Sequence, residues 1–343
     1  MNMEKKVFVY GSDNMGWSID SDRNHAIRFL NDIGMNICKT PLFCSAIHCV
    51  WWTKLRRALI APFRNKKIIA VATNEINERT EEFNKINSFV TLWIAPSRKQ
   101  ELWFLEQNIP CFYLPFYVDE KVFYPRDIPK AMLCEMLCID YALLEDRFII
   151  GSFQRDSLGE NLQKPKWQKN PDLLIDIVSE LPIDRDKFVL LLAGPRRHYI
   201  IEQCRKRNLP FVFVGKYPHN DEDDIHYNTL PTEKTALLYN LIDCYIVTSR
   251  SEGGPKGIVE ASYTKKPVIS TRTGAAPDYL CDNEIFDSKE ECIKTLCKLY
   301  NSKRFAVGIA GKSFEKSLSI GCYKKTKERY CKLYVSLGII NEG

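Results

Sequence analysis

The sequence lacks the marks of a membrane-spanning, secreted or disordered chain. No uninterrupted apolar stretch approaches the roughly 20 residues that a transmembrane helix needs. The first residues, MNMEKKVFVYGS, lead directly into a strand-like run without a signal-peptide core or cleavage site, so we expect a cytosolic protein. Low-complexity tracts and clear internal repeats are also missing. With 45% hydrophobic and 27% charged residues, the 343-residue chain has the composition of a globular protein, and its length predicts two domains.

Paired cysteine motifs are missing as well, although the chain has 13 cysteines. None forms a CxxC pair, and there are only five histidines. Cys134 and Cys138 stand four residues apart in an apolar helical pattern with no His or Cys nearby, which indicates core packing. We therefore expect reduced thiols and no metal site.

The sequence lacks the motifs that would indicate two classes of ligand, nicotinamide cofactors and nucleic acids. No G-x-G-x-x-G follows a strand, which argues against a nicotinamide-dependent dehydrogenase, and we expect no cofactor. No recognised nucleic-acid-binding module is present, so we expect no nucleic acid partner.

Acidic residues are absent between Ile33 and Asn74, where seven basic residues occur, and such a field favours anionic partners. Within this region the segment 51–67, WWTKLRRALIAPFRNKK, places Leu55, Leu59 and Phe63 at helical spacing. Such a helix either packs on its own sheet with a solvated charged face or rests on an anionic membrane surface. Both interpretations stay open.

The chain is rich in strand-like runs that alternate with helical patterns, which predicts a parallel α/β architecture. A first sheet is expected from 7–12, 46–51, 67–73 and 88–97, and a second from 147–153, 188–194, 210–215, 244–249 and 267–271. Helices are predicted at 171–181, 234–241 and 323–337. We predict an N-terminal domain at 1–125, a C-terminal domain at 126–320, and a last helical segment at 321–343 that packs on either domain.

A motif follows the predicted strand 244–249, and open α/β sheets bind ligands at such strand ends. Gly253 and Gly254 leave the backbone free to approach a ligand, and Pro255 suits a first helical turn. Glu252 and Glu260, separated by seven residues, suit the vicinal hydroxyls of a sugar ring and a ribose. A helix cap plus an ordinary surface glutamate would produce the same pattern.

This motif resembles that of the retaining GT-B glycosyltransferases of family GT4, a pattern like S-x-x-E-G-x-P-x-x-x-x-E-A. The matching residues are Ser249, Glu252, Gly253, Pro255, Glu260 and Ala261. The resemblance implies a GT-B architecture, two Rossmann-like domains facing across a cleft. It also implies that Glu260 holds the nucleotide ribose, that Glu252 lies at the donor sugar with the backbone amides of Gly253 and Gly254, and that the loop at Gly274 completes the site. Val118, Asp119, Phe123 and Pro125 keep the spacing of the family's interdomain linker.

The resemblance also implies a diphosphate clamp made of an Arg after one strand and a Lys before the next helix. Arg155 and Lys169 are the candidates, although thirteen residues separate them where the family has only a few. That insertion offers Lys164 and Lys166 as alternatives, and we favour Lys169 over Lys166. Gly215 and Lys216, after another strand, are expected at the nucleobase.

The amino-terminal half matches the family weakly. The loop with Gly11 and Gly16 is expected to contact the donor phosphates or merely to turn the chain. Asn74 stands where many family members carry a His near the donor sugar. His48 and His25 are the candidates to replace it on the acceptor side, although a lone His is more often structural.

We predict an enzyme, a retaining and metal-independent glycosyltransferase. It would move a sugar from a UDP- or GDP-linked donor to a hydroxyl of a glycan or lipid-linked acceptor. Two alternatives remain: an epimerase or hydrolase acting on a nucleotide sugar, and a non-catalytic protein that binds one.

Overall fold

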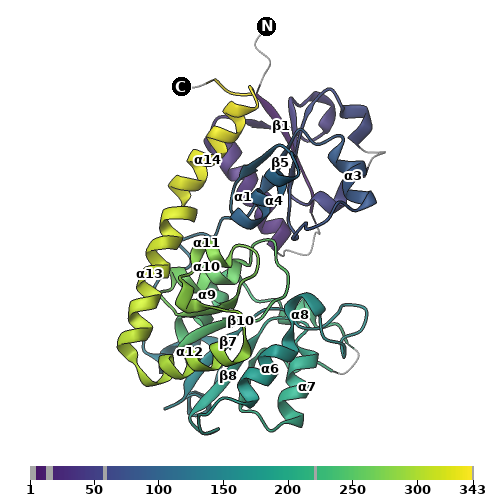
Figure 1. Ribbon diagram of the computed structural model, residues 1–343. Helices are drawn as coiled ribbons and strands as arrows, with labels where there is room; N and C mark the ends of the chain where they lie inside the picture. Colours follow the sequence, from purple (N-terminus) through teal and green to yellow (C-terminus); the bar gives the residue numbers. More distant parts are fainter. Residues whose placement is uncertain (1–4, 13–17, 57–59, 220–221, 342–343) are drawn as a thin grey trace. The chain divides into compact units, whose positions relative to one another are not determined.

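The structure is a computed structural model that describes residues 5–12, 18–56, 60–219 and 222–341 (Figure 1). The chain divides into two compact units. The N-terminal unit is Met1–Tyr117 with Ser319–Gly343, and the C-terminal unit is Val118–Leu318. The first boundary therefore precedes the predicted one at 125, because Phe123 packs against Tyr239 of the C-terminal unit with ring centroids 6.0 Å apart.

The N-terminal unit is built on six parallel strands in the order β2-β1-β3-β4-β5-β6. Buried positions dominate its central strands, as a sheet covered on both faces requires. The strands are β1 (Lys6–Tyr10), β2 (Asn36–Ile37), β3 (Ala46–Cys49), β4 (Lys67–Val71), β5 (Leu92–Ala95) and β6 (Cys111–Tyr113).

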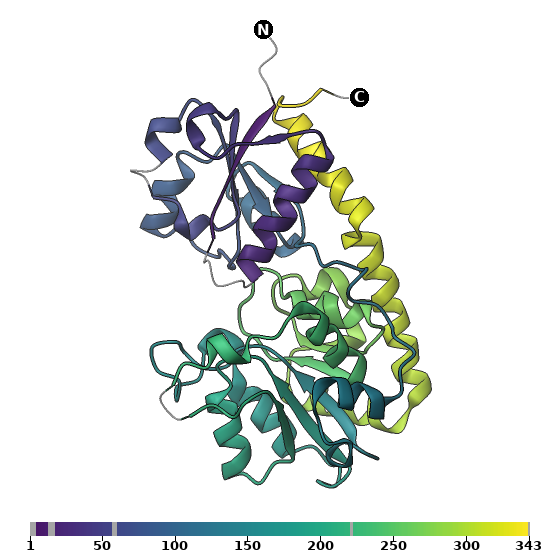
Figure 2. The ribbon, with the colours of Figure 1, turned by 180° about the vertical axis from the view of Figure 1, so that it is seen from behind.

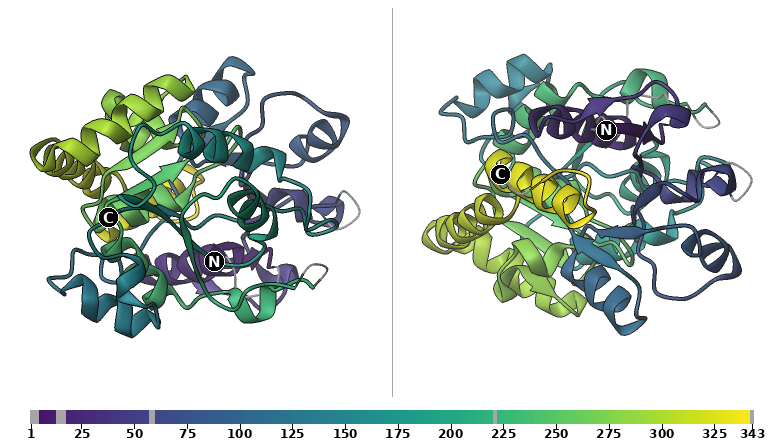
Figure 3. Two further views of the ribbon diagram at one scale, coloured as in Figure 1. Left: turned by 90° about the horizontal axis from the view of Figure 1, so that it is seen from below. Right: turned by 90° about the horizontal axis from the view of Figure 1, so that it is seen from above.

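Helices cover both faces of this sheet. On one face α1 (Ser18–Asp32) and α14 (Tyr323–Ser336) pack on a core that includes Val7, Val9 and Phe29. These two helices lie side by side when the molecule is seen from behind and from above (Figures 2 and 3). On the other face lie η2 (Trp52–Lys54), α3 (Glu81–Asn87) and α4 (Arg98–Glu106).

The segment 51–67 does not form the single helix expected from its periodicity. Its described residues form η2 and a second short 3-10 helix, η3 (Ala61–Phe63). Leu55 between them has an extended backbone, with φ −65° and ψ 134°, and its side chain is buried against the sheet. Residues 57–59, with Leu59, lie outside the described residues. The prediction of a continuous amphipathic helix is therefore wrong for this segment.

The C-terminal unit repeats the plan with six parallel strands in the order β12-β11-β10-β7-β8-β9. The strands are β7 (Phe148–Ser152), β8 (Phe188–Ala193), β9 (Phe211–Val214), β10 (Cys244–Val247), β11 (Val268–Thr271) and β12 (Ile285–Phe286). Together with the N-terminal sheet they confirm the predicted α/β class and all nine predicted strands. The sequence analysis missed the short strands β2, β6 and β12.

Alternate strand residues of this sheet face opposite layers of helices. Cys244 and Ile246 face the layer of α6, α7 and α12, whereas Tyr245 between them faces α9 and packs on Tyr239. The helices of this unit are α5 (Lys130–Leu137), α6 (Pro171–Ser179), α7 (His198–Lys206), α8 (Ile225–Asn228), α9 (Thr232–Leu241), α10 (Lys256–Tyr263), α11 (Ala276–Tyr279) and α12 (Lys289–Asn301). In sequence, α13 (Lys303–Gly321) crosses the second unit boundary.

Across the residues that the structure describes, every helix is too short or too polar to span a bilayer.

His48 makes the stability of the N-terminal unit depend on pH. Its ring is buried, its Nδ1 lies 3.0 Å from the Tyr334 hydroxyl, and burial lowers its pKa from 6.5 to about 4. Because the unfolded chain binds the proton more tightly, stability is full above pH 6.5 and falls as the pH drops toward 4. We expect this residue to account for a loss of about 2 kcal/mol between pH 7 and pH 5.

Urea unfolding at both pH values measures this loss in the wild type, in His48→Gln and in the control His226→Gln, which alters an exposed histidine. His48→Gln should lose less stability than the wild type on acidification, and the control should match the wild type. Equal losses in all three proteins would contradict the assignment to His48.

Candidate functional site

The candidate site lies where the strand order of the C-terminal sheet reverses. β7 pairs with β8 on one side and with β10 on the other, through Ile150 with Cys244 and Gly151 with Tyr245. The chain therefore leaves β7 after Ser152 and β10 after Val247 at the same edge of the sheet. Such a reversal leaves a crevice outside the carboxyl ends of the strands, where open α/β sheets bind ligands.

Lys169 and Glu252 meet at this edge. Lys169 ends the short helix η5 (Trp167–Lys169), and its Nζ forms an ion pair with Oε1 of Glu252. The same Oε1 accepts a 2.8 Å hydrogen bond from the Ser249 hydroxyl. The two charged side chains are 20% and 13% exposed, so the pair is sheltered yet within reach of solvent. Two of the predicted site residues are thus in direct contact.

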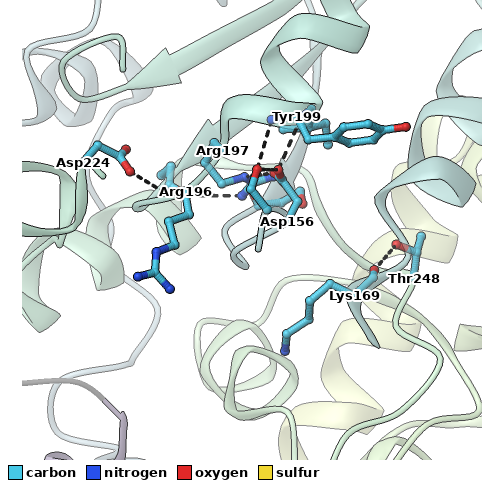
Figure 4. Close-up of polar contacts among 11 residues, drawn as sticks. Asp156, Lys169, Arg196, Arg197, Tyr199, Asp224 and Thr248 are labelled. Carbon is cyan, nitrogen blue, oxygen red and sulfur yellow. Dashed lines mark hydrogen bonds and ion pairs between the residues drawn. The ribbon is translucent and has the colours of Figure 1, made fainter. Parts of the chain in front are cut away.

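Backbone contacts fasten η5 to the loop that follows β10. The Thr248 hydroxyl lies 3.2 Å from the Lys169 carbonyl oxygen and 3.1 Å from that of Asn170 (Figure 4). The Arg250 amide donates to the Gln168 carbonyl at 2.8 Å. The position of Lys169 therefore does not depend on its ion pair alone.

A tight glycine contact shapes the Glu252 loop. Gly274, in the loop after β11, has φ +49°, and a Cβ there would lie 2.5 Å from the Glu252 carbonyl oxygen. Gly253 is buried beside this contact, and Gly254 follows. Pro255 is the N-cap of α10 and so precedes the first helical turn in which it was expected.

Glu260 lies on α10 and is oriented by Tyr239 of α9. The Tyr239 hydroxyl donates to Oε2 of Glu260 at 2.9 Å. Burial, helped by the Glu260 charge, raises the pKa of Tyr239 well above its usual value, so the phenol remains a donor. Gly257 makes room for it, because a Cβ at that position would lie 2.9 Å from the Tyr239 hydroxyl oxygen.

Arg155 and Lys166 add positive charge to the same region. Arg155 is half-buried in the loop after β7, and the Lys166 amide donates to the Asp156 carbonyl at 2.6 Å. The pKa of Lys166 is lowered to about 8, first by burial and then by the charges of Arg155 and Lys169, against which Glu252 acts. Lys164 is exposed. Lys166 thus interacts electrostatically with Arg155, Lys169 and Glu252.

A buried ion pair anchors the segment that carries Arg155. Arg197 is 0% exposed and donates through Nε to Asp156 at 2.5 Å and through Nη1 to the Ser152 carbonyl at 2.5 Å. In Figure 4 this pair lies beneath Tyr199 at the start of α7, while the Lys169 side chain extends away from it. A buried charge left unpaired is costly, so the pair holds the start of the insertion in place.

Gly215 and Lys216 belong to a separate hydrogen-bonded turn after β9. Gly215 has φ +141°, and a side chain there would collide with Asn228. The Lys216 amide donates to Oδ1 of Asn228 at 3.0 Å, and Asn228 donates to Asp224 at 2.7 Å. Asp224 also accepts from the Arg196 amide at 2.7 Å (Figure 4), which links this turn to the one after β8.

The remaining predicted residues belong to the N-terminal unit. Gly11 follows β1 with φ +102°, and a Cβ there would lie 3.2 Å from the Trp51 amide nitrogen, so backbone conformation and packing both favour a glycine. His48 is buried in β3 against Tyr334, and Asn74 is exposed in the loop after β4. Gly16 lies outside the described residues.

Ser249 and Tyr239 are the residues that sequence reasoning did not assign to the site. Ser249 was visible as part of the motif, but its bond to Glu252 was not. Tyr239 is buried, and no spacing in the sequence signals its bond to Glu260. Within the described ranges, no cluster of three or more His, Cys, Asp and Glu side chains is arranged to hold a metal ion.

Part of the chain matches a known family model. Residues 161–310, which include Lys169, Glu252 and Glu260, match the family model of glycosyl transferases group 1. A comparison with curated protein sequences gave no match.

Several solved structures share the fold over nearly the whole chain. Anabaena Alr3699/HepE in complex with UDP and glucose is similar at 14% identity and a TM-score of 0.69, over 97% of this chain and 100% of that one. A sucrose-phosphate synthase from Thermosynechococcus elongatus is similar at 12% identity and a TM-score of 0.72, over 98% and 99%. A glycosyltransferase from Rickettsia africae is similar at 15% identity and a TM-score of 0.68, over 100% of both chains. The fold is thus that of GT-B glycosyltransferases, with two Rossmann-like domains, and together with the match over 161–310 it supports a glycosyltransferase.

Gly274 supplies a structural test of the Glu252 loop. Gly274→Ala forces a side chain into the left-handed region and against the Glu252 carbonyl, so we expect a loss of about 2 kcal/mol of unfolding free energy. The control is Gly308→Ala in α13, where nothing lies within 4 Å of the new Cβ and helix propensity should give a gain of up to about 1 kcal/mol. Urea unfolding measures both; a harmless Gly274→Ala would contradict the tight contact.

Proposed function

We propose that this protein is a retaining glycosyltransferase that transfers a sugar from a nucleotide-diphosphate sugar to an acceptor hydroxyl without a metal ion. The observation that carries the proposal is the Lys169–Glu252 pair at the strand-order reversal, inside the region that matches group 1 glycosyl transferases. UDP is the first nucleotide to test, because the similar Anabaena protein was solved with UDP and the pneumococcal O-GlcNAc transferase GtfA with UDP and GlcNAc.

The cations around Glu252 suit the leaving group. Breaking the glycosidic bond leaves negative charge on the diphosphate, which fixed positive charges stabilise in a sheltered site. Lys166 lies within electrostatic reach of Arg155 and Lys169, so a diphosphate bound beside it would meet more than one positive charge. This cluster would supply the positive charge that other transferases obtain from a metal ion.

Glu260 suits the ribose of the donor. A carboxylate accepts hydrogen bonds from vicinal hydroxyls, and the Tyr239 bond holds the Glu260 side chain in one orientation before the nucleotide binds. Gly215 and Lys216, in the turn fixed by Asn228, are our candidates beside the nucleobase.

Glu252 suits an orienting role at the donor sugar better than a nucleophilic one. Its Oε1 is engaged by Lys169 and by the Ser249 hydroxyl, which lowers its reactivity toward the anomeric carbon. A retaining reaction then proceeds by front-face attack, in which the acceptor hydroxyl enters on the side of the departing phosphate and gives its proton to that phosphate. The resemblance of the 249–261 motif to GT4 enzymes supports retention.

Donor binding can be tested without knowing the acceptor. A ligand that binds only the folded protein stabilises it and so raises its unfolding temperature. At a ligand concentration 100 times the Kd, the apparent free energy of unfolding increases by about 2.7 kcal/mol. We expect UDP, or failing that GDP, to stabilise the protein more than ADP and CDP in a thermal-shift screen of nucleotides and their sugars. Product analysis then separates transfer from hydrolysis. No stabilisation by any nucleotide would refute the proposal.

Lys169 should contribute more to donor affinity than its neighbours in the insertion. Lys169→Ala removes a phosphate ligand and leaves Glu252 as an uncompensated negative charge, so we expect UDP to bind about ten- to a hundredfold more weakly. The matched control is Lys164→Ala, which removes an exposed lysine five residues away. Titration calorimetry with UDP measures both, and equal Kd values for Lys169→Ala and wild type would remove Lys169 from the clamp.

A further inference from the structure

The insertion between Arg155 and Lys169 ends in an exposed tryptophan that the proposed donor site does not use. Trp167 is 60% exposed, and it is the only tryptophan among residues 118–318. Burying a large aromatic side chain contributes about 2 kcal/mol relative to leaving it in water. Its exposure therefore raises the question of what covers the indole.

The contacts that hold η5 in place leave the Trp167 side chain out. Arg250 donates through Nη1 to the Trp167 carbonyl at 3.0 Å and through its amide to the Gln168 carbonyl at 2.8 Å. Both acceptors are backbone carbonyl oxygens, which would be present whatever side chain stood at position 167. Anchoring the insertion thus does not require an indole.

Arg250 and Trp167 present a combined surface. The Arg250 guanidinium lies 5.7 Å from the centroid of the indole ring, within the range of a cation–π contact, and Arg250 is itself exposed. A flat apolar ring is thereby placed next to a fork of hydrogen-bond donors.

This surface adjoins the proposed transfer site. Trp167 stands at the other end of the three-residue helix from Lys169, and Arg250 stands two residues before Glu252. A molecule resting on the indole would therefore lie beside the carboxylate that we place at the donor sugar.

We infer that Trp167 and Arg250 form a binding platform for a pyranose ring of the acceptor. The C–H-bearing face of a pyranose is flat and apolar and matches an indole, while its rim of hydroxyls accepts hydrogen bonds from a guanidinium. This inference rests on the proposed function and narrows the acceptor to a molecule that already carries a sugar, as opposed to a bare lipid, a bare peptide or water.

Sugar binding at this platform can be measured without turnover. Saturation-transfer difference NMR of the full chain, titrated with the methyl glycosides of glucose, galactose and N-acetylglucosamine, reports a Kd for each probe. We expect at least one probe to bind with transfer to its ring C–H protons, Trp167→Ala to weaken that binding about tenfold, and Trp167→Phe to restore part of it.

The matched control is Tyr300→Ala. Tyr300 is a partly exposed aromatic residue of α12 that contacts Phe148, the first residue of β7, and so lies at the opposite edge of the same sheet. Its removal should leave probe binding unchanged. The inferred platform would be contradicted if Trp167→Ala binds the glycosides as tightly as the wild type. It would also be contradicted if the wild type binds none of the three glycosides.

A nucleotide measurement separates this inference from the proposed function. Trp167→Ala should keep the UDP-induced rise in unfolding temperature while its KM for a glycoside acceptor increases and its kcat changes little. If no nucleotide or nucleotide sugar stabilises the wild type, the proposed function fails whatever the glycosides do. If UDP binds and Trp167→Ala keeps the wild-type KM, only the platform fails.

Discussion

The pairing of β7 with β10 is the constraint on which the candidate site depends. Parallel strands deliver their carboxyl ends to one edge, so this single pairing places the loop after Ser152 beside the loop after Val247. Lys169 and Glu252, 83 residues apart in the chain, then lie close enough to form an ion pair. With any strand inserted between β7 and β10, about 4.8 Å of sheet would be added between these loops and the pair would open.

The charge balance of the site follows from this proximity. Lys166 is repelled by Arg155 and Lys169 in a partly desolvated region, and Glu252 offsets part of that repulsion. Glu252 also forms an ion pair with Lys169. In the proposed reaction a diphosphate, which carries more negative charge than one carboxylate, would compete with Glu252 for Lys169 and leave that carboxylate to turn toward the sugar.

Sequence patterns predicted the elements better than their contacts. Strands such as β8 were recognisable because six consecutive buried residues leave a continuous apolar run, whereas β2 and β12 have two residues each and leave none. Helical periodicity failed over 51–67, because Trp52 in a short 3-10 turn and Leu55 in the extended backbone after it both pack on the sheet. Spacing selected Glu260 but not Tyr239, since their bond joins two helices whose packing only the fold determines.

The two halves of the proposed reaction differ in how far a sequence can reveal them. A nucleotide diphosphate presents the same groups whatever sugar it carries, so a site for it is recognisable from spaced glycines and carboxylates, such as those from Ser249 to Glu260. An acceptor presents hydroxyls and ring faces, which many side chains on many elements can meet. Trp167 illustrates the difference: in the sequence it is one residue of an insertion, and only its 60% exposure beside the Lys169–Glu252 pair gives it a chemical role.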